Sequence, residues 1–138
     1  MKLFLDDYRV PMDCIVHMYD RIGLLNSVYR DDKWVVLRNY PDFVRAINKY
    51  KGAVTHISFD HDLADGHYNQ NMQEGTINYD SEDFSGNDFN KTGYHAALYL
   101  KKVYVEHQLA LPIILVHTMN SVGRKNIEEV FEPTKELK

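Results

Sequence analysis

Four short apolar runs recur along the chain, and segments with helical spacing separate them. The runs cover residues 2–6, 34–38, 53–60 and 111–118, and the last of these, LPIILVHT, is an almost continuous apolar stretch. Continuous runs are typical of parallel strands buried on both faces, because a strand with one solvated face alternates between apolar and polar residues instead. We therefore predict an α/β fold in which helices cover both faces of a parallel sheet.

Between these runs, apolar residues recur at the spacing of amphipathic helices. Proline suits the first position of a helix, and Thr, Asn or Ser suits the N-cap. The predicted helices cover residues 14–29 and about 41–52, and two more begin near Thr92 and at Asn120 or Ser121. By contrast, residues 7–13, DYRVPMD, are predicted to form a loop, because Pro11 and Asp13 interrupt them.

Residues 64–91 differ in composition from the rest of the chain. They are rich in Asn, Asp, Gly, Ser and Tyr and show no sustained periodicity. A structureless stretch of this length inside a compact domain is uncommon, and it is often either a functional lid or a disordered insertion. We therefore predict a lid-like or disordered insertion within a single domain that spans residues 1–138, since the sequence shows no internal repeat.

Charge and composition narrow the class of partner. The formal net charge is −4, which argues against broad binding to duplex DNA, because that binding depends on a basic surface. A few cations can still hold one nucleotide or one RNA end. The single cysteine, Cys14, excludes an internal disulfide and fits a reducing compartment. The apolar start MKLFLDD is too short for a signal peptide and no segment reaches transmembrane length, so we expect a cytoplasmic protein without a membrane partner.

Polar and titratable residues follow each of the four predicted strands. The carboxyl ends of parallel strands meet at one edge of the sheet, and ligands bind beyond that edge in open α/β folds. In chain order, the residues are Asp6 and Asp7, then Arg38 and Asn39, then Asp60, His61 and Asp62, and finally His117 and Thr118. The sequence therefore predicts a functional site at this edge.

Four segments resemble the cyclic-phosphate processing receiver domains, a branch related to response-regulator receivers. They are LFLDDYRVP (3–11), ISFDHDL (57–63), TGYHAALYL (92–100) and LVHTMNSVGRKNI (115–127). The resemblance implies a three-layer, receiver-like or flavodoxin-like fold with four main strands in the order 2-1-3-4. It also implies that the protein acts on a cyclic phosphate, such as the 2′,3′-cyclic end of an RNA or a related nucleotide, with two histidines central.

In that strand order His61 and His117 end adjacent strands, so we expect the two imidazoles to flank one phosphate. Opening a cyclic phosphodiester needs a base to activate water and an acid to protonate the departing oxygen, and histidine suits both tasks. Which histidine is the acid and which is the base stays open. Asp60 or Asp62 can accept the second ring N–H of a histidine and fix its tautomer. These four residues are the predicted catalytic group.

The carboxylates also allow a metal-dependent alternative. Asp6, Asp7 and Asp60 resemble the acidic pocket of receiver domains, and hard cations such as Mg²⁺ prefer carboxylate oxygens. Both versions, one with Mg²⁺ and one without a cofactor, stay open at this point.

A bound phosphate also needs positive charge or N–H donors. The start of a helix offers both, through free N–H groups and the positive end of the helix dipole. The predicted phosphate ligands are Arg9, Thr92, Gly93, Thr118 and Arg124.

Two other classes of function use the same edge of the sheet. A stand-alone receiver would be phosphorylated on Asp60, but receivers normally carry a lysine after a fifth strand, and Lys135 lies in a tail without a strand pattern. A non-catalytic module that binds a cyclic nucleotide needs the same pocket as an enzyme, and only turnover separates the two. The favoured interpretation is a phosphoesterase, a cyclic phosphodiester hydrolase acting on a nucleotide or an RNA end.

Overall fold

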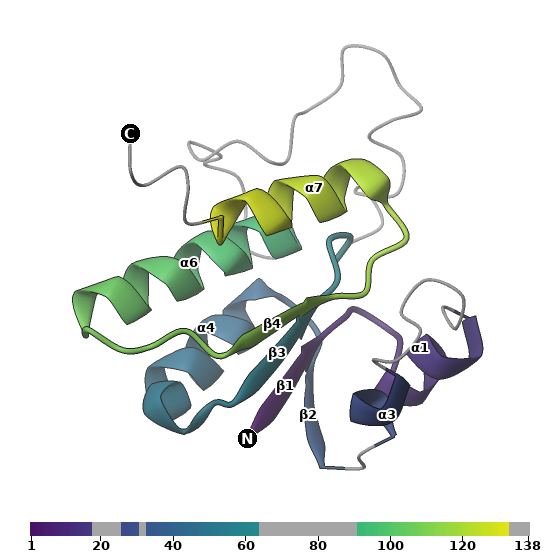
Figure 1. The fold of residues 1–138 in the computed structure, drawn as a ribbon, viewed down its shortest axis with the longest axis horizontal. Coiled ribbons are helices and arrows are strands. Elements are labelled where there is room, and N and C mark those ends of the chain that lie inside the picture. The colour runs from purple at the N-terminus through teal and green to yellow at the C-terminus, as the bar shows by residue number, and fades with distance from the viewer. Residues whose placement is uncertain (18–25, 31–32, 64–90, 133–138) are drawn as a thin grey trace.

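A computed structural model describes residues 1–17, 26–30, 33–63 and 91–132 (Figure 1). Its central layer is a parallel sheet of four strands in the order β2-β1-β3-β4, which confirms the predicted fold class. Leu5 lies level with Phe59 across one strand pair, and Phe59 lies level with Val116 across the next. The strands are β1 (Lys2–Leu5), β2 (Trp34–Leu37), β3 (His56–Phe59) and β4 (Ile113–Val116).

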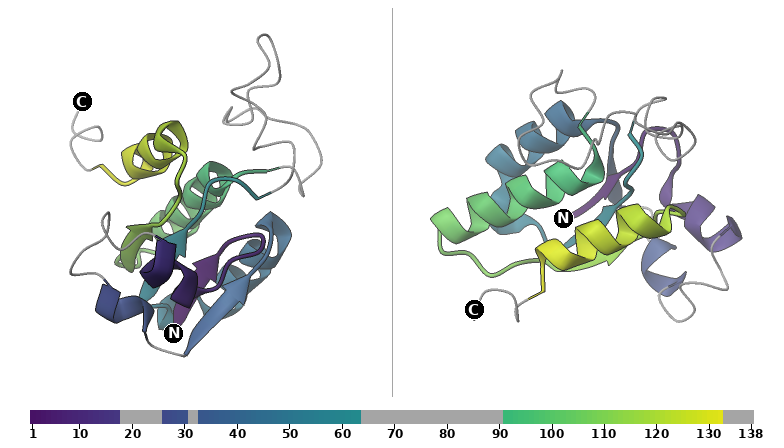
Figure 2. Two further views of the ribbon diagram at one scale, coloured as in Figure 1. Left: turned by 90° about the vertical axis from the view of Figure 1, so that its right-hand side faces the viewer. Right: turned by 90° about the horizontal axis from the view of Figure 1, so that it is seen from above.

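Helices lie on both sides of this sheet (Figures 1 and 2). Helices α4, α6 and α7 contribute to the core on one face, and α1 and α3 cover the other. No helix in the described part of the chain is long and apolar enough to cross a membrane. The helices are α1 (Pro11–His17), α3 (Asn26–Tyr29), α4 (Tyr40–Tyr50), the 3₁₀ turn η2 (Lys51–Ala53), α6 (Gly93–Glu106) and α7 (Ser121–Val130).

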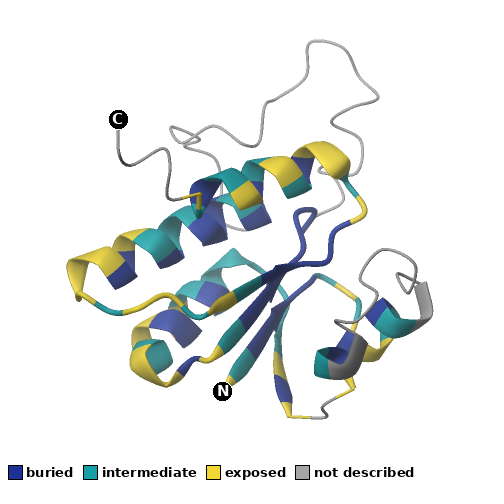
Figure 3. Ribbon diagram, viewed as in Figure 1, coloured by how far each residue is buried: buried dark blue, intermediate teal, exposed yellow. Residues whose placement is uncertain are grey.

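The core is divided into two clusters by the sheet. Successive side chains of a strand point to opposite faces, so Leu3 and Leu5 of β1 pack toward α4, α6 and α7, whereas Phe4 packs toward α1 and α3. All three side chains are completely buried. Burial continues past the ends of β3 and β4, where the chain is still coloured as buried (Figure 3). Polar residues that follow these strands therefore lie inside the protein rather than on its surface.

Local sequence features explain where three of the helices begin. The side chain of Asn39 accepts the N–H of Asp42 at 2.9 Å and caps α4, whose first turn contains the predicted Pro41. Thr92 caps α6 and Asn120 caps α7, both as predicted. These caps satisfy N–H groups that have no partner within the helix itself.

The predicted loop over residues 7–13 is confirmed for residues 7–10 and is wrong from Pro11 onward, where α1 begins. A proline is tolerated in the first turn, where its missing N–H has no intrahelical partner to lose, and Asp13 accepts the N–H of Val10 at 2.9 Å. The predicted helix over 14–29 is represented by α1 and α3, with residues 18–25 outside the described part. The predicted insertion lies outside it as well, except for residue 91.

Candidate active site

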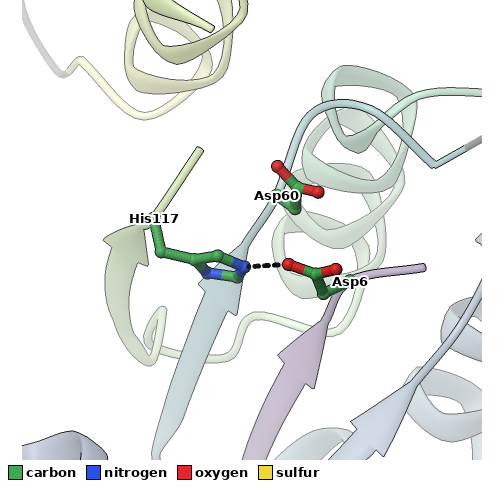
Figure 4. A group of neighbouring side chains, drawn as sticks. All are labelled: Asp6, Asp60 and His117. Atoms are coloured by element: carbon green, nitrogen blue, oxygen red, sulfur yellow. Dashed lines mark hydrogen bonds and ion pairs between the residues drawn. The ribbon is translucent and has the colours of Figure 1, made fainter. Parts of the chain in front are cut away.

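Polar residues continue the ladder of the sheet just beyond its strands. The N–H of Asp60 donates to the carbonyl of Leu5 at 2.9 Å, and the N–H of His117 donates to the carbonyl of Phe59 at 3.0 Å. Asp6 follows directly after β1. The three side chains meet at the carboxyl edge of the sheet (Figure 4), and all are buried. The sequence prediction that strand ends gather polar groups is confirmed for these residues.

Asp6 and His117 form a fully buried pair. The Nε2 atom of His117 lies 3.0 Å from Oδ2 of Asp6, and Oδ1 of Asp6 accepts the backbone N–H groups of Tyr8 and Arg9 at 3.0 and 2.8 Å. Burial raises the pKa of Asp6, but the hydrogen bond and the electrostatic interaction with His117, together with the hydrogen bonds from the two amides, outweigh it, and the pKa is lowered. Burial also lowers the pKa of His117. At neutral pH the pair is therefore a carboxylate beside a neutral imidazole.

The other ring nitrogen of His117 belongs to a buried chain of hydroxyl groups. Its Nδ1 atom lies 2.6 Å from Oγ of Ser58, and that oxygen lies 2.7 Å from the hydroxyl of Tyr29. The ring of Phe4 stacks on the imidazole, with 4.3 Å between centroids and 8° between planes. Phe4 and Ser58 lie two residues before Asp6 and Asp60, so strand alternation puts them on the same face of the sheet. Both ring nitrogens of His117 are thus engaged by the protein.

His61 forms the second histidine–carboxylate pair. Its Nδ1 atom lies 2.8 Å from Oδ1 of Asp62, and the two side chains are 0% and 12% exposed. The amide nitrogen of Asn120 lies 3.4 Å from the same carboxylate oxygen, while the amide oxygen of Asn120 accepts the N–H of Gly123 at 3.0 Å. Asn120, the N-cap of α7, therefore also contacts the His61–Asp62 pair. Asp62 occupies the position predicted for a carboxylate that fixes a histidine tautomer.

Two glycines allow helices to approach the strand end closely. A Cβ atom at Gly123 would lie 2.3 Å from Cγ of His61, and one at Gly93 would lie 1.9 Å from the carbonyl oxygen of Asp60. Atoms in real structures do not approach so closely. Glycine is thus required at the start of α7 for its packing on the His61 ring, and at the start of α6 for its packing on the strand end.

The two histidines pack on different sides of the sheet. His61 contacts α7, which belongs to the core cluster of α4 and α6, whereas His117 contacts Phe4 and Tyr29 of the opposite cluster. The expectation that both imidazoles flank one phosphate considered only that their strands are neighbours. Strand alternation decides the face, so a phosphate that touched both rings would have to lie across the strand ends.

Asp60 has an unusual acidity for a carboxyl group. Burial and the negative charge of Asp6 raise its pKa to about 7, although a hydrogen bond with Thr118 and the positive charge of Arg9 act in the opposite direction. Its Oδ1 atom accepts the N–H of His61 at 2.9 Å. A carboxyl group that titrates near neutral pH can serve as a general acid or base there.

Asp6, Asp60 and His117 also form a candidate metal group in the described part of the chain. Their ligand atoms all lie within 4.8 Å of one another. Two carboxylates and one imidazole suit Mn²⁺ or Zn²⁺ better than Mg²⁺, which prefers oxygen ligands alone. The predicted ligand Asp7 is only partly buried and does not belong to this group, whereas His117, which the sequence did not suggest as a ligand, does.

The helix start at Thr92 and Gly93 does not offer the free N–H groups that were predicted. The N–H of Thr92 bonds Nδ1 of His95 at 3.2 Å, that of Gly93 bonds the carbonyl of His61 at 2.9 Å, and that of Tyr94 bonds the hydroxyl of Thr92 at 3.1 Å. The physical reason is a capping box between Thr92 and His95, which gives the N–H groups at the helix start hydrogen-bond partners within the protein. Thr92 and Gly93 therefore hold α6 against the strand end through these hydrogen bonds.

The other predicted phosphate ligands differ in their surroundings. Arg9 is partly buried, and its guanidinium lies 5.4 Å from the centroid of the Tyr8 ring. Arg124 lies in the first turn of α7 with a side chain that is 29% exposed. After burial and Asp6, the charges of both arginines are further influences on the pKa of His117. Thr118 is buried, and its hydroxyl accepts the N–H of Asn120 at 3.2 Å.

Sequence reasoning missed Tyr29 and Ser58, and it treated Asn120 only as a helix cap. Ser58 is the one residue with a hydroxyl group in the buried strand β3. It lies two residues before Asp60, so strand alternation could have placed it on the same face of the sheet as Asp60. Tyr29 carries no such signal, because its hydroxyl reaches Ser58 only through the packing of α3 on the sheet.

Residues 1–133 match the sequence model of a family described as the cyclic-phosphate processing receiver domain. Comparisons with curated proteins and with solved structures returned no match. The matched range contains both histidine–carboxylate pairs, the Ser58 and Tyr29 hydroxyls and the three residues of the candidate metal group.

Proposed function

The chain belongs to the cyclic-phosphate processing receiver domain family, and on this basis we propose that it is a phosphoesterase that opens a cyclic phosphodiester. The observation that carries the proposal is the presence of two buried histidine–carboxylate pairs, His61–Asp62 and His117–Asp6, at the carboxyl edge of one sheet. The proposed substrate is a 2′,3′-cyclic nucleotide, an RNA that ends in one, or a related nucleotide.

In the proposed reaction water attacks phosphorus, and the bond between phosphorus and one ribose oxygen breaks. A base takes a proton from the water and an acid gives a proton to the departing oxygen, so the product is a linear phosphate monoester. The His61–Asp62 pair suits the base, because the carboxylate holds the ring and stabilises the imidazolium that forms. His117 is the alternative candidate for the base and for the acid.

Asp60 is suited to the acid. Its pKa of about 7 means that a large fraction of the carboxyl groups carries a proton at neutral pH, which an exposed aspartate would not. The phosphate charge would be met by Arg9 and Arg124, with the hydroxyl of Thr118 as a further donor. A positioned acid or base contributes roughly 10²- to 10⁴-fold to a rate, so the loss of either group would be severe.

A metal-dependent version of the reaction uses the same edge. Asp6, Asp60 and His117 would hold the ion, and a bound divalent ion would polarise a phosphate oxygen. The two versions require opposite protonation states of Asp60. The metal-free version needs a protonated Asp60 as the acid, whereas the metal-dependent version needs an ionised Asp60 as a ligand. Removal of metal therefore separates them.

Phosphorus NMR with a 2′,3′-cyclic nucleotide and a cyclic-phosphate-ended RNA, with and without EDTA, tests the proposal. We expect the linear phosphate signal to grow with wild-type protein and to be lost in His61→Gln and Asp60→Asn. His107→Gln is the matched control, because His107 is exposed at the end of α6. Activity that survives EDTA supports metal-free chemistry, and activity that EDTA abolishes supports the metal-dependent version.

Two results would overturn the proposal in different ways. A cyclic signal that broadens in proportion to protein concentration without turnover would indicate a binding module. Formation of an acyl phosphate on Asp60 from acetyl phosphate, again without turnover of the cyclic substrates, would indicate a phosphoacceptor receiver.

A further inference from the structure

The chain of hydrogen bonds behind His117 has a direction, and the direction is set at Tyr29. This side chain is 1% exposed, and within the described part of the protein its hydroxyl has one hydrogen-bond partner, Oγ of Ser58. A buried O–H group that makes no hydrogen bond loses the free energy of its hydration without compensation. Tyr29 is therefore the donor, and Ser58 is the acceptor.

The direction continues from Ser58 to His117. Since Oγ of Ser58 accepts from Tyr29, its own O–H is available to Nδ1 of His117 at 2.6 Å, and that nitrogen carries the lone pair. The ring proton then resides on Nε2 and points at Oδ2 of Asp6. The far end of the chain agrees, because Oδ1 of Asp6 accepts two backbone N–H groups, as an ionised carboxylate does.

We infer that Tyr29 and Ser58 are positioning residues that hold His117 as the neutral tautomer with its proton on Nε2, directed at Asp6. The stacked ring of Phe4 supports the same orientation. The catalytic consequence rests on the proposed function. In this tautomer His117 has no lone pair facing Asp6 and Asp60, so it does not accept a proton from water there. The base is then His61, and His117 keeps Asp6 oriented.

The same tautomer affects the candidate metal group. An ion held by Asp6, Asp60 and His117 needs a lone pair on Nε2, which requires the opposite tautomer. Both hydroxyls would then have to turn, and the hydroxyl hydrogen of Tyr29 would lose Ser58 as its acceptor. The Tyr29–Ser58 chain therefore opposes metal binding in the state that the structure shows.

Nitrogen NMR of the full chain, labelled with ¹⁵N-histidine and kept in EDTA, tests the tautomer without any substrate. Comparison with His117→Gln identifies the His117 signals. We expect an unprotonated Nδ1 and a protonated Nε2 in the wild type, and the reverse pattern would overturn the inference. Tyr29→Phe keeps the ring but frees Ser58 to reverse, so its signals should move toward a mixed tautomer population. Unchanged signals in Tyr29→Phe would exclude a role for the Tyr29 hydroxyl.

Kinetics tests whether this positioning matters to the reaction. We expect Tyr29→Phe and Ser58→Ala to lower kcat by about 10- to 100-fold with little change in KM, and Ser58→Thr, which keeps a hydroxyl, to recover most of it. Tyr99→Phe is the matched control, because the Tyr99 hydroxyl bonds Asn48 at the exposed surface. An unchanged kcat in Tyr29→Phe would refute the positioning role. A wild type with the expected tautomer but no turnover would refute the proposed function instead.

Discussion

Replacing Asp60 by Asn should change how the stability of the protein depends on pH. The folded chain raises the pKa of Asp60 from 3.8 to about 7, chiefly through burial, so it binds this proton more tightly than the unfolded chain does. The resulting contribution to stability is fully present below pH 4 and is lost as the pH rises through about 7. Asparagine has the shape of a protonated aspartate and does not titrate, so the variant should lack this loss.

The size of the effect follows from the two pKa values. Between pH 5 and pH 8, the difference in proton binding makes the wild type lose roughly 3 kcal/mol through Asp60 alone. His117 acts in the opposite sense, because burial lowers its pKa and its contribution to stability is lost as the pH falls. Both proteins contain His117, so subtracting their free energies of unfolding isolates Asp60.

Urea unfolding followed by the fluorescence of Trp34, the single tryptophan, gives these free energies in buffers with EDTA. Asp60→Asn should become more stable relative to wild type by roughly 3 kcal/mol as the pH rises from 5 to 8. Glu106→Gln, which alters an exposed carboxyl group, should follow the wild type throughout. A constant difference between Asp60→Asn and wild type would refute the assignment of a raised pKa to this residue.

Three further predictions concern the groups around the two pairs. Gly123→Ala should cost about 1–3 kcal/mol of stability in urea unfolding and reduce turnover, because its Cβ meets the His61 ring; Gly52→Ala, with open space around it, should not reduce turnover. Asn120→Ala should cost about 1 kcal/mol through the lost cap and lower kcat through the His61–Asp62 pair, and an unchanged kcat would exclude the second effect. In calorimetric titrations Mn²⁺ should bind more tightly than Mg²⁺. Asp6→Asn should weaken the binding of Mn²⁺, whereas Asp7→Asn should leave it unchanged. Equal effects of the two substitutions would show that Asp7 is also a ligand.

The fold was predictable because its determinants are local. The apolar run before His117 marks a strand whose last two residues are buried, and Thr92 and Asn120 begin helices where a cap is expected. The same residue types misled at Pro11, since a proline can either interrupt a chain or begin a helix, and only packing decides between the two.

The site was predictable only as far as strand order determines it. Parallel strands bring Asp6, Asp60 and His117 to one edge. The alternation of strands and helices predicts a parallel sheet, whereas the order of the strands is implied only by the family resemblance. The face on which each ring packs depends on contacts between distant segments. The hydroxyl of Tyr29 reaches a histidine 88 positions later through Ser58, and no pattern within either segment records that contact.

Turnover of a 2′,3′-cyclic nucleotide in ¹⁸O-enriched water, followed by phosphorus NMR, decides whether this site opens a cyclic phosphate. We expect wild-type protein to convert the cyclic signal to that of a linear monoester carrying one ¹⁸O atom from water, and His107→Gln to do the same. His61→Gln should leave the cyclic signal in place. A cyclic signal that also persists with wild-type protein, at a concentration comparable to that of the substrate, would contradict the claim that this site opens a cyclic phosphate.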